Sequence, residues 1–231
     1  MKELYEKSRE KDDELPTWDE AVKMGVYTRE YAPTVSMKKF RDDPAANALT
    51  TPSGKIEIFS EKLLKDTEGW ELTDGDTLAC LNTLPPIPAY IPEWDGVETT
   101  TDEYPLALGG FHYRGRLHSS WGGIEELKEV NPQEAWINPA DAEPRGIEQG
   151  DTVQVKNEFG TIELLAKVTP RVIPGMVAIS QGAWHNADMS SSDPKARLDK
   201  GGCINTLTTH RPSPLAKGNP QHSNICEVVK A

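Results

Sequence analysis

A polar, glycine-rich loop from Gly109 to Ser120 carries the residues best suited to chemistry in this chain. It combines two arginines, two histidines and two serines with glycines that let the backbone approach a ligand. Backbone N–H groups of such turns bind anions, and arginine makes planar two-point contacts to phosphate. The spacing matches neither the GxGxxG fingerprint nor the P-loop. We expect the loop to bind an anion, and an exposed basic loop without a ligand is the alternative.

Two further segments combine polar residues with glycine. Gln181–His185 follows an apolar run, and Trp184 within it could flank a flat ligand, although such a tryptophan more often packs in or beside a core. Residues 201–222 are too long and too rich in proline for a hairpin, which is typical of a binding loop. Between residues 171 and 226, six basic residues oppose three acidic ones. This local positive balance favours an anionic ligand over a solvated surface.

Other kinds of site are disfavoured by their missing patterns. Cys80, Cys203 and Cys226 form no CxxC pair, so we expect them to be buried small hydrophobic residues rather than metal or cluster ligands. The GxSxG and HExxH motifs are absent. His112 and His118 fit hydrogen bonding better than metal binding. We therefore assign no catalytic acid, base or metal ligand in this chain.

The elements that position these loops belong to a β-rich second half. Strands are predicted at 104–108, 135–137, 152–156, 161–168, 176–180 and 225–229. A short helix is predicted at 124–130, and Asn138 followed by Pro139 should begin another. Asn157–Gly160 is predicted to be a hairpin turn. Short, mostly antiparallel strands with small helices between them predict a small closed barrel.

The first half has little structure of its own. A capping box at Thr17 predicts a helix that ends near Gly25, and Ser60 should cap another short helix. Lys55–Phe59 alternates in polarity and is predicted to be a strand. The proline-rich stretch Thr83–Glu103 predicts an extended connector. This half has too few apolar runs for their burial to offset the conformational entropy that the chain loses on folding. We therefore expect it to pack on something else.

Composition limits the partners of the chain. Its 231 residues are 36% hydrophobic and 27% charged, with a net charge of −12. An acidic protein repels phosphate backbones, so nucleic-acid binding is not expected. No apolar run approaches the roughly 18–20 residues that cross a bilayer, so direct membrane insertion is not expected. Residues 1–100 carry a net charge of −9 and residues 101–231 carry −3, which predicts two regions with different roles.

Several motifs resemble the dimethyl sulfoxide reductase family of molybdopterin oxidoreductases. Residues 51–60 (TPSGKIEIFS) are similar to a stretch of that family. Residues 136–142 (WINPADA) and 145–153 look like the signature of its C-terminal molybdopterin dinucleotide-binding domain. Residues 201–208 and 211–220 resemble the catalytic A subunits of anaerobic dimethyl sulfoxide reductases in particular. The resemblance runs over nearly the whole chain.

This resemblance implies a fold and a ligand. The fold is mainly β with short helices: a six-stranded double-psi β-barrel over residues 102–231, the molybdopterin dinucleotide-binding domain. It is preceded by an irregular α/β segment, residues 1–101, the remnant of a central catalytic region plus the connector. The implied ligand is bis(molybdopterin guanine dinucleotide) molybdenum. The implied cofactor-binding residues are Gly110, His112, Arg114, Arg116, His118, Ser119, Ser120, Trp184, Asn205, Asn219, Gln221 and His222.

The resemblance also implies a role within a larger oxidoreductase that reduces sulfoxides or N-oxides. The chain would be its C-terminal part, would position the cofactor and would be inactive alone. An iron–sulfur cluster would belong only to the missing N-terminal part. The implied partners are the remainder of the catalytic subunit, an iron–sulfur electron-transfer subunit and a membrane anchor, with a periplasmic or membrane-associated location. The alternative is a stand-alone β-barrel that binds a nucleotide or a partner without redox activity.

Overall fold

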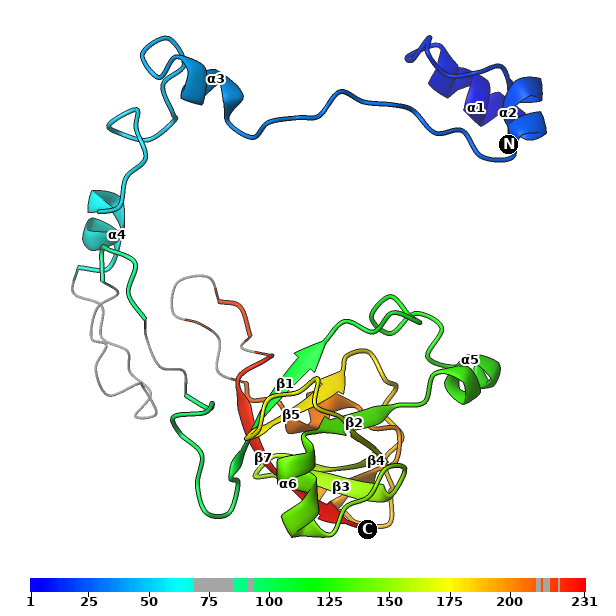
Figure 1. Ribbon diagram of the computed structural model, residues 1–231, viewed down its shortest axis with the longest axis vertical. Helices are drawn as coiled ribbons and strands as arrows, with labels where there is room; N and C mark the ends of the chain where they lie inside the picture. The colour runs from blue at the N-terminus through cyan, green and yellow to red at the C-terminus, as the bar shows by residue number, and fades with distance from the viewer. Residues whose placement is uncertain (69–84, 91–93, 211–212, 214–216, 220) are drawn as a thin grey trace. The chain divides into compact units, whose positions relative to one another are not determined.

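The computed structural model (Figure 1) describes residues 1–68, 85–90, 94–210, 213, 217–219 and 221–231. Within it the chain forms two compact units, Met1–Ile58 and Phe59–Ala231. Cys80, parts of the proline-rich connector and parts of the 211–220 motif lie outside the described residues. In the described part of the chain, no helix combines the length and the apolar content needed to span a membrane.

The first unit consists of short helices without a core. They are α1 (Lys2–Arg9), α2 (Trp18–Met24) and α3 (Lys38–Asp42). The predicted capping box is present, because Glu20 N donates to Thr17 Oγ1 at 3.3 Å and Thr17 N donates to Glu20 Oε2 at 2.8 Å. The rings of Tyr5 and Trp18 meet edge to face at 5.5 Å. No residue from 1 to 58 is buried, in agreement with the acidic, apolar-poor composition.

The strand predicted at Lys55–Phe59 is wrong. The segment forms bends, and it folds back on the preceding turn: Thr51 Oγ1 donates to Lys55 O at 2.6 Å and Ser53 N donates to Glu57 Oε1 at 2.7 Å. Alternating polarity does not produce a strand by itself, because ladder hydrogen bonds need a neighbouring strand. The described residues supply no such neighbour to this segment.

The second unit is a closed β-barrel, preceded by α4 (Glu61–Asp66), which Ser60 caps as predicted. The strands are β1 (Leu106–Phe111), β2 (Glu134–Ile137), β3 (Thr152–Asn157), β4 (Gly160–Val168), β5 (Met176–Ser180), β6 (Leu198–Asp199) and β7 (Asn224–Lys230). The order β2-β5-β1-β7-β3-β4 closes through a pairing of β2 with β4, and β6 adds to β4. Within this ring β1–β5 and β2–β4 are parallel and the other pairs are antiparallel. The predicted six-stranded barrel is confirmed.

Residues close to the strand ends predict most of the strand boundaries that the structure shows. The predicted hairpin turn joins β3 to β4, where Asn157 pairs with Gly160 and the Asn157 Oδ1 accepts from Phe159 N at 3.0 Å. β1 differs from its prediction, since it continues through Gly109 and Gly110 to Phe111. These glycines pair with β5 in a parallel ladder, and this long-range pairing overrides their local tendency to form a turn.

Short helices lie around the barrel. They are α5 (Glu125–Val130), α6 (Pro139–Ala142) and the 3-10 turns η1 (Glu143–Arg145), η2 (Pro194–Ala196) and η3 (Ile204–Leu207). α6 and the C-terminus lie at one end of the barrel, and β1 and β5 point toward the other end (Figure 1). Asn138 caps α6 as predicted, with its Oδ1 accepting from Ala140 N at 2.9 Å.

The core fills the barrel interior with aliphatic side chains. Its fully buried members include Leu108, Ile137, Val153, Val155, Ile162, Val177, Ile179, Leu207 and Val228. Cys226 is fully buried among them, as predicted for a small hydrophobic residue, whereas Cys203 is only partly buried. The core therefore lies in and around the barrel, and the polar, glycine-rich segments of interest are the loops that leave it.

Candidate functional site

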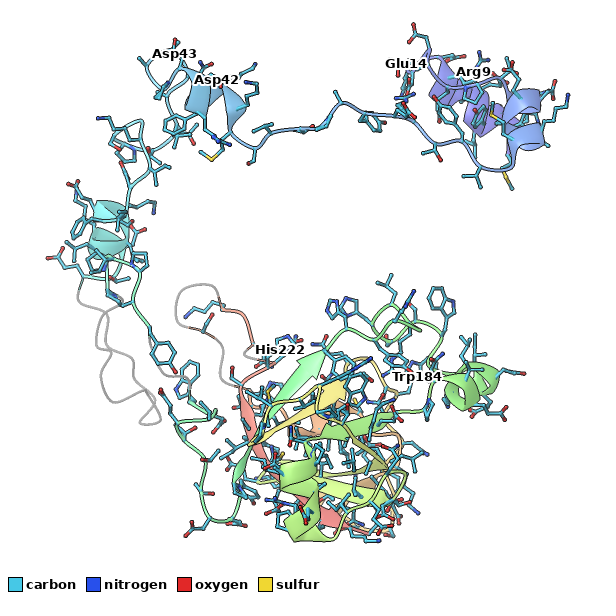
Figure 2. All side chains as sticks on the ribbon, viewed as in Figure 1. Arg9, Glu14, Asp42, Asp43, Trp184 and His222 are labelled. Atoms are coloured by element: carbon cyan, nitrogen blue, oxygen red, sulfur yellow. The ribbon has the colours of Figure 1, made fainter. Side chains whose placement is uncertain are left out.

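The segments that follow β1 and β5 meet at one end of the barrel. Because these strands are parallel neighbours, with Phe111 paired to Ser180, both chains leave the sheet side by side. Gln181 N continues the contact by donating to Phe111 O at 2.9 Å. Trp184 and His222 lie at this same end (Figure 2). The fold thus brings together the loop from Gly109 to Ser120, the segment Gln181–His185 and the part of residues 201–222 around His222, which the sequence singles out as three separate segments.

A small polar cluster forms where these regions touch. Gln181 Nε2 and His222 Nε2 lie 3.3 Å apart. A Cβ on Gly110 would lie 3.1 Å from Gln181 Nε2 and 3.3 Å from His222 Nδ1, so glycine at this position leaves room for both side chains. Gln221 is exposed, and its carbonyl accepts from Asn224 Nδ2 at 3.2 Å.

The two loops are in backbone contact at Gly182. This residue has φ +87°, and a Cβ on it would lie 1.9 Å from His118 O. Two residues further along the chain, Trp184 Nε1 donates to Ser119 O at 2.8 Å. The indole also covers Gly122, where a Cβ would lie 2.6 Å from Trp184 Cδ1. Trp184 therefore fastens the loop after β1, while 57% of its surface stays exposed and available to a flat ligand.

Arg116 is half-buried and turned toward the protein. Its Nε donates to Gln181 O at 3.0 Å, and its Nη2 donates to Ser180 Oγ at 2.8 Å and to Gln133 Oε1 at 2.6 Å. The guanidinium also lies over the Tyr113 ring, 5.2 Å from its centroid. Burial lowers the pKa of Arg116. Two of its nitrogens therefore join the loops, and Nη1 makes no hydrogen bond to a described residue.

The rest of the loop presents donors outward. The side chains of His112, Arg114, His118, Ser119 and Ser120 are exposed and form no hydrogen bond with the described part of the protein. The rings of the two histidines meet edge to face at 5.0 Å. The backbone N–H groups of residues 112–119 also find no described acceptor. Such a set of donors, with a cationic side chain among them, suits an anionic ligand.

Two sizeable cavities adjoin this loop, besides a small one of about 20 Å³ beside Tyr113 and Gly115. One, of about 230 Å³, lies between the loop and the end of β5 and is lined by His112, Tyr113, Arg116, Leu117, His118 and Gln181. The other, of about 620 Å³, lies beside the indole, and its lining includes Arg116, Gln133, Trp184, His185, Asn186 and Lys200. Arg116 borders both cavities. A ligand with several separate groups has room on both sides of this arginine.

Two predicted site residues do not join the cluster. Asn205 lies in η3 and Asn219 in the segment before His222, and both are exposed. No contact among the described residues connects their side chains to the loop after β1. Their assignment to the site stays a prediction.

Two residues that organise the site are missed by the sequence reasoning. Asp199 is fully buried, and its carboxylate accepts from Asn186 N at 2.7 Å, Gly201 N at 2.9 Å and Cys203 N at 2.8 Å. Gln133 binds three separate segments, including Arg116. In the sequence, Asp199 stands out only as an acidic residue shortly before two glycines in a basic stretch. Gln133 stands out only because it follows a proline that ends a helix.

Comparison with known proteins gives consistent matches. The family model described as the molydopterin dinucleotide binding domain matches residues 106–225. Dimethyl sulfoxide reductase DmsA of Escherichia coli (strain K12) is 48% identical over 233 residues, which cover 100% of this chain and 27% of that protein. The trimethylamine-N-oxide reductase of Haemophilus influenzae (strain ATCC 51907 / DSM 11121 / KW20 / Rd) is 36% identical over 196 residues, covering 83% of this chain and 22% of that protein.

A solved structure supports the fold. Acetylene hydratase from Pelobacter acetylenicus matches with a TM-score of 0.60 and 20% identity, over 82% of this chain and 25% of that one. At this identity the likeness concerns the fold alone. The chain spans about a quarter of the length of the curated relatives that it matches.

Proposed function

Since this chain belongs to the molydopterin dinucleotide binding domain family, we propose that its barrel-end loops bind the guanine form of that molybdenum cofactor, bis(molybdopterin guanine dinucleotide). The family makes a molybdopterin dinucleotide the class of ligand. The proposal concerns the form of the dinucleotide and the residues that hold it. These are Gly110, His112, Arg114, Arg116, His118, Ser119, Ser120, Trp184, Asn205, Asn219, Gln221 and His222.

One observation carries the proposal: the donors after β1 lack protein acceptors. The N–H groups of residues 112–119 and the side chains of Arg114 and His118 point to no acceptor in the described structure. A dinucleotide offers a pyrophosphate, which is acceptor-only and charged, and flat rings with polar edges. Pyrophosphate matches the donors, and the exposed indole of Trp184 matches a flat ring. The residues present therefore fit the group.

The residues of this chain hold the cofactor and do not react with substrate. When bound, the cofactor supplies two-electron oxygen-atom transfer. The backbone N–H groups of 112–119 fix phosphate oxygens, Arg114 adds positive charge, His118 adds a directed hydrogen bond, and Trp184 limits the position of a ring. No acid, base or metal ligand is assigned to this chain.

The wider activity follows from the relatives. The E. coli and H. influenzae proteins are named as reductases of dimethyl sulfoxide and of trimethylamine N-oxide, and the first of them matches the whole chain. This supports a role in a reductase of sulfoxides or N-oxides over the alternative of a stand-alone barrel. An iron–sulfur cluster elsewhere in that enzyme, an iron–sulfur subunit, a membrane anchor and a periplasmic or membrane-associated location remain parts of the proposal that rest on the family alone.

The test is pterin content. We would purify the chain from a host that makes the guanine dinucleotide cofactor, denature it, oxidise the supernatant and quantify pterin fluorescence and guanine nucleotide per chain. The pair Arg114→Ala with His118→Ala should lower pterin content at least tenfold, because hydrogen bonds to a charged phosphate contribute on the order of 1.5–3 kcal/mol each and about 1.4 kcal/mol is a factor of ten. Arg171→Ala removes an exposed arginine beyond the other end of the barrel and should leave pterin content unchanged.

A chimera separates a wrong site from an incomplete one. Replacing the matching part of E. coli DmsA with this chain restores the rest of that protein around it. A folded chimera without pterin would contradict the proposed site. So would a chimera whose pterin content is unchanged when Arg114 and His118 are replaced by alanine. Reduction of dimethyl sulfoxide by the chimera tests the wider activity independently.

A further inference from the structure

The amide of Gln133 has every hydrogen-bonding position filled. Its Oε1 accepts from Arg116 Nη2 at 2.6 Å and from Ser180 Oγ at 2.5 Å. Its Nε2 donates to Ser180 O at 2.8 Å and to Gly202 O at 3.0 Å. An amide group has two acceptor and two donor positions, so the side chain of Gln133 is saturated.

These contacts join three segments that are distant in sequence. Arg116 belongs to the loop after β1, Ser180 is the last residue of β5, and Gly202 belongs to the loop after β6. The separations from Gln133 are 17, 47 and 69 residues respectively. Gly202 also packs on the stem of the side chain, since a Cβ there would lie 2.9 Å from Gln133 Cγ. All three segments border the two cavities of the candidate site or lead into them.

The surroundings specify an amide and no other group. Toward Arg116 and the Ser180 hydroxyl the side chain must present an acceptor, and toward two backbone carbonyls it must present donors. A carboxylate would oppose the carbonyls, and an apolar side chain would leave the two carbonyls without these donors and Arg116 Nη2 without one of its acceptors. Leaving buried polar groups unpaired costs more than their hydrogen bonds contribute when formed.

We infer that Gln133 is a positioning residue for the cofactor loop: it holds Arg116 against β5 and thereby fixes residues 112–120 in the conformation that presents their donors outward. The contribution of Gln133 to ligand binding rests on the proposed function. Its effect on the loop does not, because the contacts are made within the protein alone. The two claims are therefore tested by separate measurements.

The first measurement is limited proteolysis of the full chain without cofactor. Trypsin cleavage after the exposed Arg114 reports whether the loop is held, and cleavage after Arg171 reports general loosening. Gln133→Met, which keeps the bulk and removes the polar atoms, should raise the cleavage rate after Arg114 about tenfold and leave Arg171 unchanged. Gln149→Met, at an exposed glutamine whose Oε1 accepts from Val168 N, is the matched control.

The second measurement is a double-mutant cycle on pterin content per folded chain. If Gln133 acts through Arg116, Gln133→Met alone should lose pterin about tenfold, and the double variant should lose no more pterin than Arg116→Met alone. A general structural role would instead give losses that multiply in the double variant. Should Gln133→Met fail to fold, Arg116→Met carries the proteolysis test, because it removes the same contact from its other side, and a wild-type cleavage rate after Arg114 in that variant overturns the positioning role.

The outcomes are distinguishable. A wild-type rate after Arg114 in the variant, or equal increases at Arg114 and Arg171, overturns the positioning role. Independent losses in the cycle overturn the route through Arg116. A wild-type chain and chimera that hold no pterin contradict the proposed function, while the proteolysis result still decides the positioning role.

Discussion

Gly182 shows how a single residue sets the distance between the two site loops. Its φ of +87° is a region that glycine adopts readily, and a Cβ would lie 1.9 Å from His118 O. Backbone atoms cannot yield to such a contact without moving the loop. Gly182→Ala should therefore destabilise the fold by about 2–4 kcal/mol and displace the loop after β1.

Gly146 provides the matched control for that substitution. It also has a positive φ, +62°, but a Cβ there would meet nothing within 4 Å. Gly146→Ala should thus cost only the backbone term, about 1 kcal/mol. Urea unfolding of both variants gives the comparison. Equal losses of stability in Gly182→Ala and Gly146→Ala would mean that the close approach to His118 O does not add to the cost at Gly182.

Cys226 predicts a fall in stability at alkaline pH. Complete burial raises the pKa of this thiol well above its ordinary value. Below about pH 8.5 the thiol is protonated in both the folded and the unfolded chain, so its contribution is fully present. Above that pH the unfolded chain loses the proton and the folded chain keeps it, so the free energy of unfolding falls, by about 1.4 kcal/mol for each further pH unit at most.

Cys226→Ala removes that titration. Urea unfolding at pH 7.5 and 9.5, with reductant present, should show the extra alkaline loss in the wild-type chain and not in the variant. Cys203 remains in both proteins, and burial raises its thiol pKa as well, so it cancels in the comparison. The same pH dependence in both proteins would contradict the role assigned to Cys226.

At the scale of elements, what the sequence predicts well is local. The capping box at Thr17, the cap at Asn138 and the turn at Asn157–Gly160 each depend on residues within a few positions of one another, and all three are confirmed. The strand at Lys55–Phe59 is wrong and β1 is longer than predicted, because both depend on whether a distant strand is present to pair. Periodicity describes one strand and says nothing about its neighbour.

The same distinction applies to the site. The loop from Gly109 to Ser120 stands out because its residue types are unusual over a short span. Gln133 and Asp199 do not, because their partners lie elsewhere in the chain: Gln133 is 47 residues from Ser180 and 69 from Gly202, and Asp199 reaches back 13 residues to Asn186. Only the closed barrel brings these groups together.

The cap of α6 gives a prediction at this scale. Asn138 makes two hydrogen bonds: Oδ1 accepts from Ala140 N at 2.9 Å, and Nδ2 donates to Val172 O at 2.6 Å. Asn138→Ala loses both bonds and should cost about 2 kcal/mol, whereas Asn138→Asp keeps the cap and should cost about half of that. Thermal unfolding of the two variants measures the split.

Pterin content is the internal control for these variants. α6 lies at the end of the barrel opposite the candidate site (Figure 1). Both variants should therefore hold as much pterin per folded chain as the wild type. A loss of pterin without a loss of folded protein would mean that the two ends of the barrel are coupled.

At the scale of the whole molecule, core and charge are separated along the chain. The hydrophobic core is built from residues between Leu106 and Val228, and no residue from 1 to 58 is buried. Most of the acidic excess, a net charge of −9, lies in residues 1–100. An acidic segment without a core gains little from folding by itself, since apolar burial is the main term that opposes the loss of chain entropy.

The predicted domain of residues 102–231 should consequently fold alone. It contains the whole barrel, so it should unfold cooperatively with a Tm within about 5 °C of the barrel transition in the full chain, a shift worth on the order of 1–2 kcal/mol. Residues 1–58 expressed alone should give the far-UV circular dichroism of a largely unfolded chain, because short helices without tertiary packing are marginal in water. A broad, non-cooperative transition of the 102–231 piece would instead mean that the preceding residues complete the barrel, and a cooperative transition in 1–58 would contradict the absence of a core there.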